Sequence, residues 1–311
     1  MRTILSFLAA LVAAAALAGC GTDPADDGVV SIVATTTQVA DLARNVAGER
    51  AEVTGILAPN SDPHEYEPRP SDAEAVARAD LILASGGEID AWLDQVVAGS
   101  GSDAPVDELI DHVRTLPDPE GEGLDPHWWQ DPRNAISAVA EIRDRLIEID
   151  PGGRRAYAAG AASYIRELRE LDARIAGCFE RLPAAERKLV TSHDALGYYA
   201  NRYAIEIVGA ALPAQTTQAQ PSAGETAALI ELIRSAGVET IFPEAGVNAE
   251  LEAAIAAGSG AEVGGELWAD SLGPSDSDGS TYLEATAANT ERIVAGLGDG
   301  EVACPLGAAL G

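Results

Sequence analysis

Short apolar runs rich in β-branched residues alternate along this chain with longer stretches in which apolar positions recur every three or four residues. In the first half, the short runs cover residues 29–34, 53–57, 80–84 and 106–113. Helical stretches follow the first three runs and begin near Thr37, Ser71 and Ile89. Because this alternation is typical of βαβ units, it predicts an α/β fold with parallel sheets.

The alternation returns in the second half of the chain. Short apolar runs there cover residues 189–191, 205–210, 240–242 and 262–267. Helical stretches cover residues 222–236, 248–257 and 282–297. Roughly 270 residues follow the N-terminal segment, which is enough chain for two α/β domains of ordinary size.

Between these halves, residues 132–182 have a helical pattern that is broken once, at Asp150-Pro151-Gly152. The second part predicts one long amphipathic helix that ends at Pro183. A helix of that length can span a whole domain. Its apolar positions are Tyr157, Ala161, Tyr164, Leu168, Leu171, Ile175 and Phe179.

The N-terminus has the pattern of an export signal. Arg2 precedes an apolar or small run over residues 4–19, which is too short for a comfortable membrane span. The run closes with Leu17-Ala18-Gly19-Cys20, which resembles a bacterial lipobox. We therefore predict a signal peptide over 1–19, a lipidated Cys20 and a flexible tether over 20–28. The alternative is a buried helix with an incidental cysteine, and the polar tether argues against it.

Charge and cysteine content narrow the class of partner. The chain has 50 acidic and 20 basic residues and a net charge of -30, which repels nucleic acid. With Cys20 assigned to lipid, Cys178 and Cys304 remain. Outside the cytoplasm two such cysteines favour a disulfide, and their separation excludes a CxxC metal site.

Three of the four histidines lie in loops that follow predicted strands. They are His64, His127 and His193, and Asp270 has the same kind of position after the last strand. Ligands of open α/β sheets bind in the crevice beyond the carboxyl ends of the strands. Three imidazoles and one carboxylate suit a tetrahedral Zn²⁺ site, whereas Mn²⁺ usually prefers more oxygen ligands.

Each of these histidines taken alone is more often a plain loop residue; the joint placement of the four side chains is what favours a metal site. Nearby carboxylates are candidates for orienting the imidazoles. These are Asp62, Glu65, Asp194 and Glu244. His112 lacks a strand-end context and is interpreted as structural. Ser192-His193-Asp194 is no catalytic triad, because consecutive residues do not point at one another. We interpret the tryptophans as packing residues of the core or of a cleft wall.

Together these motifs resemble the substrate-binding lipoproteins of the zinc/manganese ABC-transporter family, cluster A-I or solute-binding protein family 9. The resemblance covers about residues 29–298 and is carried by Ala34-Thr35-Thr36, Asp62-Pro63-His64-Glu65-Tyr66-Glu67-Pro68, Asp125-Pro126-His127, Thr191-Ser192-His193-Asp194-Ala195 and Asp270-Ser271-Leu272.

This resemblance implies two Rossmann-like lobes joined by one long rigid helix, with a metal bound in the cleft between them and handed to a membrane permease. His64, His127, His193 and Asp270 fall on the four ligand positions of the family. The expected units are an N-terminal lobe, a linking helix, a C-terminal lobe and a tail, over residues 29–150, 151–184, 185–298 and 299–311.

One departure from the family is the stretch 117–125, which is acidic and has no histidine where many zinc members have a histidine-rich loop. Manganese members usually have two histidines and two carboxylates, so His193 favours zinc. We expect an extracytoplasmic, lipid-anchored monomer that captures Zn²⁺ and does not bind nucleic acid.

The alternatives are a Mn²⁺ or Fe²⁺ binder of the same family, a secreted zinc hydrolase and a surface adhesin. A hydrolase needs an open metal position and a general base. The chain has no H-E-x-x-H, and Asp270 would fill the fourth position. No feature of the sequence tests a role in cell adhesion.

Overall fold

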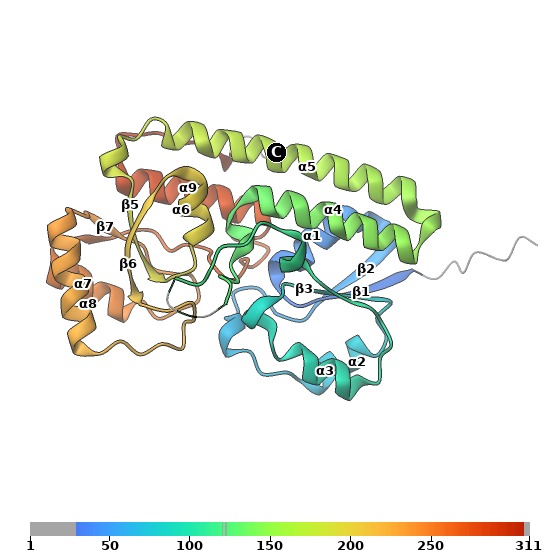
Figure 1. Ribbon diagram of the computed structural model, residues 1–311. Coiled ribbons are helices and arrows are strands. Elements are labelled where there is room, and N and C mark those ends of the chain that lie inside the picture. The colour runs from blue at the N-terminus through green and yellow to red at the C-terminus, as the bar shows by residue number, and fades with distance from the viewer. Residues whose placement is uncertain (1–28, 120, 122, 308–311) are drawn as a thin grey trace, which may run out of the picture.

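A long helix runs across the top of two α/β lobes that lie side by side (Figure 1). This computed structural model describes residues 29–119, 121 and 123–307. The predicted signal peptide, the lipidated Cys20 and the whole tether lie outside the described residues. Within the described part of the chain, none of the helices is long and apolar enough to cross a bilayer.

The N-terminal lobe has a parallel sheet in the order β2-β1-β3-β4. All four residues of β3 are buried, as expected for a parallel strand covered on both faces. Three of the predicted strands are present with small shifts of their ends, and β4 is shorter than predicted because a 3₁₀ turn begins at Leu109. The strands are β1 (Val30–Ala34), β2 (Ala51–Gly55), β3 (Leu81–Ala84) and β4 (Val106–Glu108).

The helices of this lobe are α1 (Thr37–Ala47), α2 (Pro70–Val76) and α3 (Leu93–Ser100). The side chain of Thr36 caps α1, and Gly48 ends it with a φ of 57° that favours glycine. The prediction that a helix begins at Ile89 was wrong, because Ile89 lies in a 3₁₀ turn that precedes α3. The buried carboxylate of Asp90 accepts hydrogen bonds from the backbone of Ser85 and Gly86, which holds the chain in that turn.

Two helices connect the lobes: α4 (Pro132–Ile149) and α5 (Arg154–Phe179). They are separated by a turn at the predicted break, where Asp150 accepts hydrogen bonds from the Gly153 backbone and the Tyr157 hydroxyl. The predicted apolar positions of α5 are buried. Along its length this helix contacts α1 and α4 of the N-terminal lobe, and then α6 (Gly197–Tyr203) and α9 (Tyr282–Leu297) of the C-terminal lobe. It therefore spans both lobes.

The C-terminal lobe pairs β5 with β6 and β7 with β8, all parallel. A bridge from Thr191 to Phe242 places β5 beside β7. Its strands are β5 (Lys188–His193), β6 (Glu206–Leu212), β7 (Thr240–Ile241) and β8 (Glu262–Val263). Besides α6 and α9, its helices are α7 (Ala223–Ala236) and α8 (Glu250–Ser259).

One strand of this lobe is shorter than predicted, and one helix was not predicted. The strand expected over 262–267 has only two residues, because regular pairing is interrupted after Val263 and returns only as a bridge between Leu267 and Glu244. Gly264 lies at the interruption, where a Cβ would lie 2.8 Å from the ring of Phe242. Helix α6 was not predicted, since its seven residues are too few for a clear helical period.

One apolar core runs through both lobes. It joins Ile32 of β1 and Leu42 of α1 to Leu168 of α5, and continues to Leu189 of β5 and Ile293 of α9. Helix α9 of the C-terminal lobe packs on α1 of the N-terminal lobe and on α5. The contacts between helices therefore do not mark a sharp boundary between the two lobes. The expected limits of the lobes, residues 29–150 and 185–298, therefore stay a prediction.

Candidate metal site

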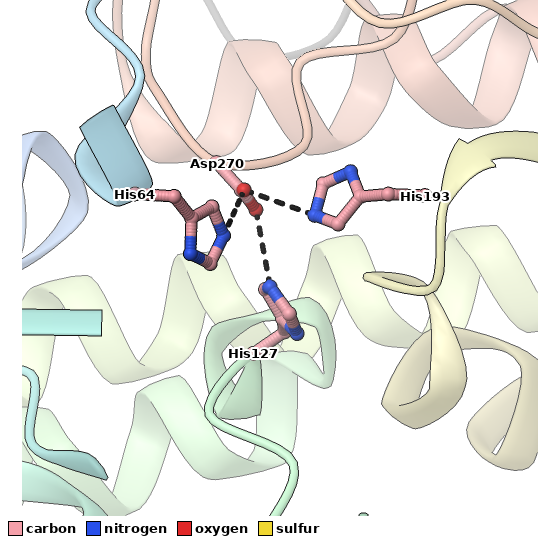
Figure 2. A group of neighbouring side chains, drawn as sticks. All are labelled: His64, His127, His193 and Asp270. Carbon is pink, nitrogen blue, oxygen red and sulfur yellow. Dashed lines mark hydrogen bonds and ion pairs between the residues drawn. The ribbon is translucent and has the colours of Figure 1, made fainter. Parts of the chain in front are cut away.

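Four side chains from distant parts of the chain meet between the lobes. Their candidate ligand atoms all lie within 4.8 Å of one another, and we call His64, His127, His193 and Asp270 the His/Asp cluster. Figure 2 shows the three imidazoles pointing at the carboxylate of Asp270 from different directions. The structure thus brings together all four side chains that the sequence singled out.

Each member is held by a strand end or a short turn. His64 lies in the 3₁₀ turn Pro63–Glu65, which follows β2. His127 directly precedes the turn Trp128–Gln130, and His193 is the last residue of β5. Asp270 lies in the loop after β8. The cluster therefore occupies the carboxyl-end crevice expected of parallel sheets.

Short distances join the carboxylate of Asp270 to each ring. Its Oδ2 lies 2.9 Å from Nε2 of His64 and 3.0 Å from Nε2 of His193, and its Oδ1 lies 3.5 Å from Nε2 of His127. The side chains of His127, His193 and Asp270 are 0%, 1% and 2% exposed, and that of His64 is 8% exposed. His64 is therefore the most solvent-accessible member of the cluster.

Carboxylates orient two of the rings. Oδ1 of Asp125 lies 2.8 Å from Nδ1 of His127, and Oε2 of Glu244 lies 2.7 Å from Nδ1 of His193. Each contact favours the tautomer with its proton on Nδ1, which directs the lone pair of Nε2 towards Asp270.

Several inner atoms of the cluster lack hydrogen-bond partners. Nε2 of His127, Nε2 of His193 and Oδ1 of Asp270 are buried and form no hydrogen bond, although both rings lie within ion-pair distance of Asp270. Buried polar atoms without hydrogen bonds are costly, and a cation bound between them would stabilise them. The donor set of three imidazole nitrogens and one carboxylate therefore fits a divalent metal ion.

Electrostatics keep the carboxylate charged. Burial alone would raise the pKa of Asp270, but His193 and His127 hold this pKa well below its usual value. Burial would likewise lower the pKa of His193, but the charges of Asp270 and Glu244 outweigh it and raise the pKa well above its usual value. A metal that enters the cluster must therefore displace protons from the imidazoles.

Comparison with known proteins identifies the family. The model of the family described as zinc-uptake complex component A, periplasmic (ZnuA), matches residues 32–296. The chain belongs to this family. It is therefore the extracytoplasmic metal-binding component of an ABC uptake system and is not an enzyme. We refer to it below as the receptor.

Relatives of the receptor have names that mention different metals. The manganese-binding lipoprotein MntA of Halalkalibacterium halodurans is 32% identical over 96% of this chain and 99% of its own. The iron-binding protein YfeA of Yersinia pestis is 31% identical over 95% of this chain and 94% of its own. The structure of the periplasmic zinc-binding protein TroA of Treponema pallidum matches with a TM-score of 0.80 and 28% identity, over 87% of this chain and 99% of that one. The predicted two-lobe α/β fold is confirmed by this match.

The predicted orienting carboxylates have mixed outcomes. Glu244 contacts the His193 ring as described, whereas Asp62 accepts hydrogen bonds from the backbone of His64 and from Thr217 instead of from a ring. In the described part of the receptor, Glu65 and Asp194 form no hydrogen bond with an imidazole. Asp125 was not among the predicted orienting carboxylates, although its position two residues before His127 was a usable local signal.

His112 lies outside the His/Asp cluster, as interpreted from the sequence. Its ring contacts Asp107 at 3.1 Å and Glu141 at 3.4 Å, and these three groups lie close enough together to share a cation. The guanidinium of Arg145, however, already lies 3.1 Å from Asp107 and 2.9 Å from Glu141. We interpret this group as an ion-pair network that joins the region of β4 to α4.

A cavity of about 750 Å³ leads from solvent to the cluster, and its wall includes His64. Acidic side chains from the N-terminal lobe, Glu88, Glu108 and Asp111, line it together with Trp92. Hydrogen bonds cross between the lobes beside it, from Thr217 to Asp62 at 2.5 Å and from Gln218 to the His64 carbonyl at 2.6 Å. The cavity thus offers a cation a path to the cluster that is lined by acidic groups and by the partly exposed imidazole of His64.

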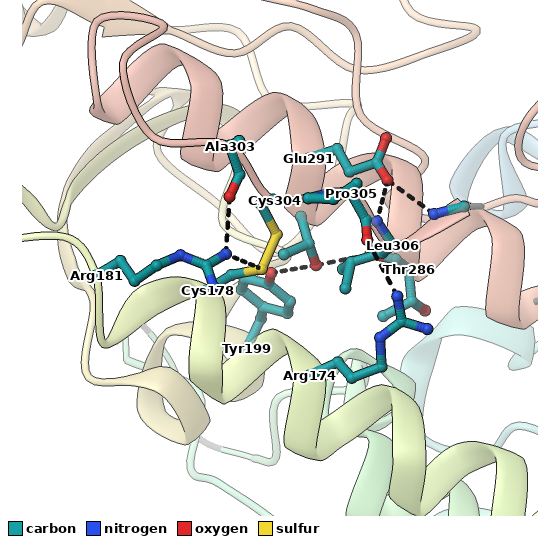
Figure 3. Close-up of a disulfide and its surroundings, with 12 residues drawn as sticks. Arg174, Cys178, Arg181, Tyr199, Thr286, Glu291, Ala303, Cys304, Pro305 and Leu306 are labelled. Carbon is teal, nitrogen blue, oxygen red and sulfur yellow. Dashed lines mark hydrogen bonds between the residues drawn. A yellow bond between two sulfur atoms is a disulfide. The ribbon is translucent and has the colours of Figure 1, made fainter. Parts of the chain in front are cut away.

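A disulfide lies far from this cavity. Cys178 of α5 and Cys304 of the tail are joined with a Cα–Cα distance of 5.5 Å. Figure 3 shows Arg181 and Arg174 donating to the carbonyls of Ala303 and Pro305 on either side of it. The tail is therefore held on α5 by both covalent and polar contacts. The side chain of Leu306, a residue of the tail, is buried.

Proposed function

We propose that the receptor captures Zn²⁺ through the His/Asp cluster and delivers it to the membrane permease of its ABC transporter. One observation carries the proposal: three imidazoles and one carboxylate converge on one point, and the inner atoms of His127, His193 and Asp270 have no hydrogen-bond partner there. Borderline-soft nitrogen donors in a four-ligand set favour Zn²⁺. The zinc-binding name of TroA supports the same choice.

Manganese is the second candidate. The name of the MntA relative mentions this metal, and identity to it extends over almost the whole chain. Asp270 has two oxygens inside the cluster, so a bidentate carboxylate would add an oxygen ligand for Mn²⁺. The iron-binding name of YfeA supports Fe²⁺ by similarity alone.

Further proposals follow from the sequence. We propose that Cys20 carries the lipid that anchors the receptor to the cell membrane, and that the receptor acts as a monomer. The net charge of -30 opposes any binding of nucleic acid. A role in adhesion is supported by none of the geometry described above.

The metal is identified by elemental analysis of receptor purified without chelator, followed by competition titration of metal-free receptor with Zn²⁺ and Mn²⁺. The proposal expects one zinc per chain and displacement of Mn²⁺ by equimolar Zn²⁺. Recovery of manganese, with Mn²⁺ retained against Zn²⁺, would establish the second candidate. The Asp270→Ala variant serves as the matched control for binding at the cluster.

A further inference from the structure

Trp129 and Gln130 share a single acceptor that lies next to a member of the His/Asp cluster. The indole Nε1 of Trp129 donates to the carbonyl oxygen of Ala269 at 3.0 Å, and Nε2 of Gln130 donates to the same oxygen at 2.8 Å. Both side chains are buried. The two lone pairs of this carbonyl are thus both satisfied by residues about 140 positions earlier in the chain.

The other side of Asp270 is tied to the same lobe. The backbone N–H of Leu272 donates to the hydroxyl of Thr37 at 2.8 Å, and the carbonyl of Leu272 accepts from the N–H of Asn60 at 2.8 Å. Residues 269–272 are therefore bracketed by hydrogen bonds to the N-terminal lobe. The nearest backbone hydrogen bond to the C-terminal lobe on this side lies one residue earlier, where the N–H of Trp268 donates to Asn289 of α9.

This bracket places the members of the cluster in two unequal groups. His64, His127 and Asp270 are all fixed to the N-terminal lobe, whereas His193 alone is fixed to the sheet of the C-terminal lobe. His127 also directly precedes the turn that carries Trp129 and Gln130. One turn therefore sets the positions of two members of the cluster.

We propose that Trp129 and Gln130 are positioning residues that hold Asp270 on the N-terminal lobe, so that three ligands are preset and His193 completes the site. This inference rests on the proposed metal site. Groups behind a metal ligand fix its orientation, and their loss typically lowers affinity about 10–100-fold. The pair contacts the backbone beside the ligand and not the metal, so it acts through Asp270.

The test uses the variants Trp129→Phe, Gln130→Ala and the double variant, with Tyr157→Phe as the matched control. Tyr157 of α5 is equally buried and loses a comparable bond, because its hydroxyl donates to Oδ2 of Asp150 at 2.8 Å. That bond holds the turn between α4 and α5 and touches no member of the cluster. For each variant, Zn²⁺ affinity is measured by competition titration, the bound Co²⁺ spectrum is recorded, and the metal-free protein is melted.

The double variant is expected to lose about 10–100-fold in Zn²⁺ affinity. Its Co²⁺ spectrum should weaken in the visible region, as more than one water enters in place of the displaced carboxylate oxygen and the coordination number rises. Tyr157→Phe should lower the melting temperature but leave affinity and spectrum unchanged. In an Asp270→Asn background, the double variant should cause no further loss, because the effect runs through that carboxylate.

Unchanged affinity in the double variant, while Asp270→Asn binds weakly, would overturn the inference and leave the proposed site intact. Equal loss in Tyr157→Phe would also overturn it, since general loosening of the core would then explain the effect. Failure of Asp270→Asn to weaken binding would refute the proposed site itself. If the double variant does not fold, the Gln130→Ala variant alone decides the question by the same measurements.

Discussion

Glu244 holds the ring of His193 through a contact of 2.7 Å between Oε2 and Nδ1, and both side chains are buried. The two residues are 51 positions apart in the chain, His193 at the end of β5 and Glu244 in the segment that follows β7. This pairing fixes which nitrogen of His193 faces Asp270. The first prediction concerns its removal.

Glu244→Ala should weaken metal binding about 10–100-fold, because Nδ1 loses its acceptor and the ring is free to change tautomer. Glu244→Gln keeps an acceptor oxygen but removes the charge, and its affinity should lie between those of Glu244→Ala and the wild type. Isothermal titration with Zn²⁺ measures both. Glu250→Ala, at an exposed position in the first turn of α8, is the control. Wild-type affinity in Glu244→Ala would show that this carboxylate does not orient the ring.

The second prediction concerns thermal stability. Binding to the native state alone stabilises by about 2.7 kcal/mol at a hundredfold excess of metal over Kd. At roughly 2–4 °C per kcal/mol, the melting temperature should rise by at least about 5 °C. His64→Ala, His127→Ala and His193→Ala should each abolish most of this shift, whereas Asp270→Ala should keep part of it because water can enter the open position.

His112→Ala is the control for these variants, since its contacts with Asp107 and Glu141 lie outside the cluster. It should melt at a lower temperature without metal but show the full shift with metal. An unchanged shift in the His64→Ala, His127→Ala double variant would place the metal elsewhere.

The third prediction concerns pH. Because the folded-state pKa of His193 is raised, this group stabilises the metal-free receptor fully below about pH 6.5, and the contribution is lost as pH rises through the raised pKa. Metal affinity should change in the opposite sense and fall as pH drops, since the imidazoles must lose their protons. Calorimetry in buffers of different ionisation enthalpy should detect proton release on binding at neutral pH. A heat that is independent of the buffer would contradict this.

The fourth prediction concerns the disulfide. Closing a loop of 126 residues between Cys178 and Cys304 stabilises the fold by about 4–5 kcal/mol in the entropic model. Thiol counting on denatured, unreduced mature receptor should find none, and the Cys178→Ala, Cys304→Ala double variant should unfold at a lower denaturant concentration. Metal affinity should stay unchanged, because the bridge lies outside the cavity. Two reactive thiols in the wild type would rule the bridge out.

The fifth prediction concerns the anchor. If Cys20 is the mature N-terminal residue and carries lipid, mass spectrometry of membrane-extracted receptor should find an acylated N-terminal cysteine. Cys20→Ala should release the receptor from the membrane fraction or block its processing. An unmodified Cys20 in a soluble product would contradict the prediction.

Sequence patterns predicted those parts of the fold that depend on local periodicity. Helix α5 and its break at Asp150 were clear because buried positions recur over many turns and a proline follows. The early end of the last strand was not predictable, since regular pairing is interrupted where Gly264 passes close to the ring of Phe242 and returns only as a bridge at Leu267. A close approach between segments that are distant in sequence leaves no local pattern.

The cluster itself was predictable because each member follows a predicted strand, and parallel sheets collect such ends at one edge. The groups that hold it were only partly predictable. Asp125 could have been predicted from its position two residues before His127. The hydrogen bonds from Trp129 and Gln130 to the carbonyl of Ala269 could not, because they depend on tertiary structure and on a backbone atom that every residue has.

Helix α5 has 26 residues, which at about 1.5 Å each makes a rod of roughly 39 Å along both lobes. Lobes joined by extended strands can swing apart through a few backbone rotations, but bending this helix would break its hydrogen bonds and uncover its apolar side. Loaded and empty receptors must therefore have nearly the same outline. A permease that accepts only the loaded form has to distinguish the two by small displacements of the loops around the mouth of the cavity.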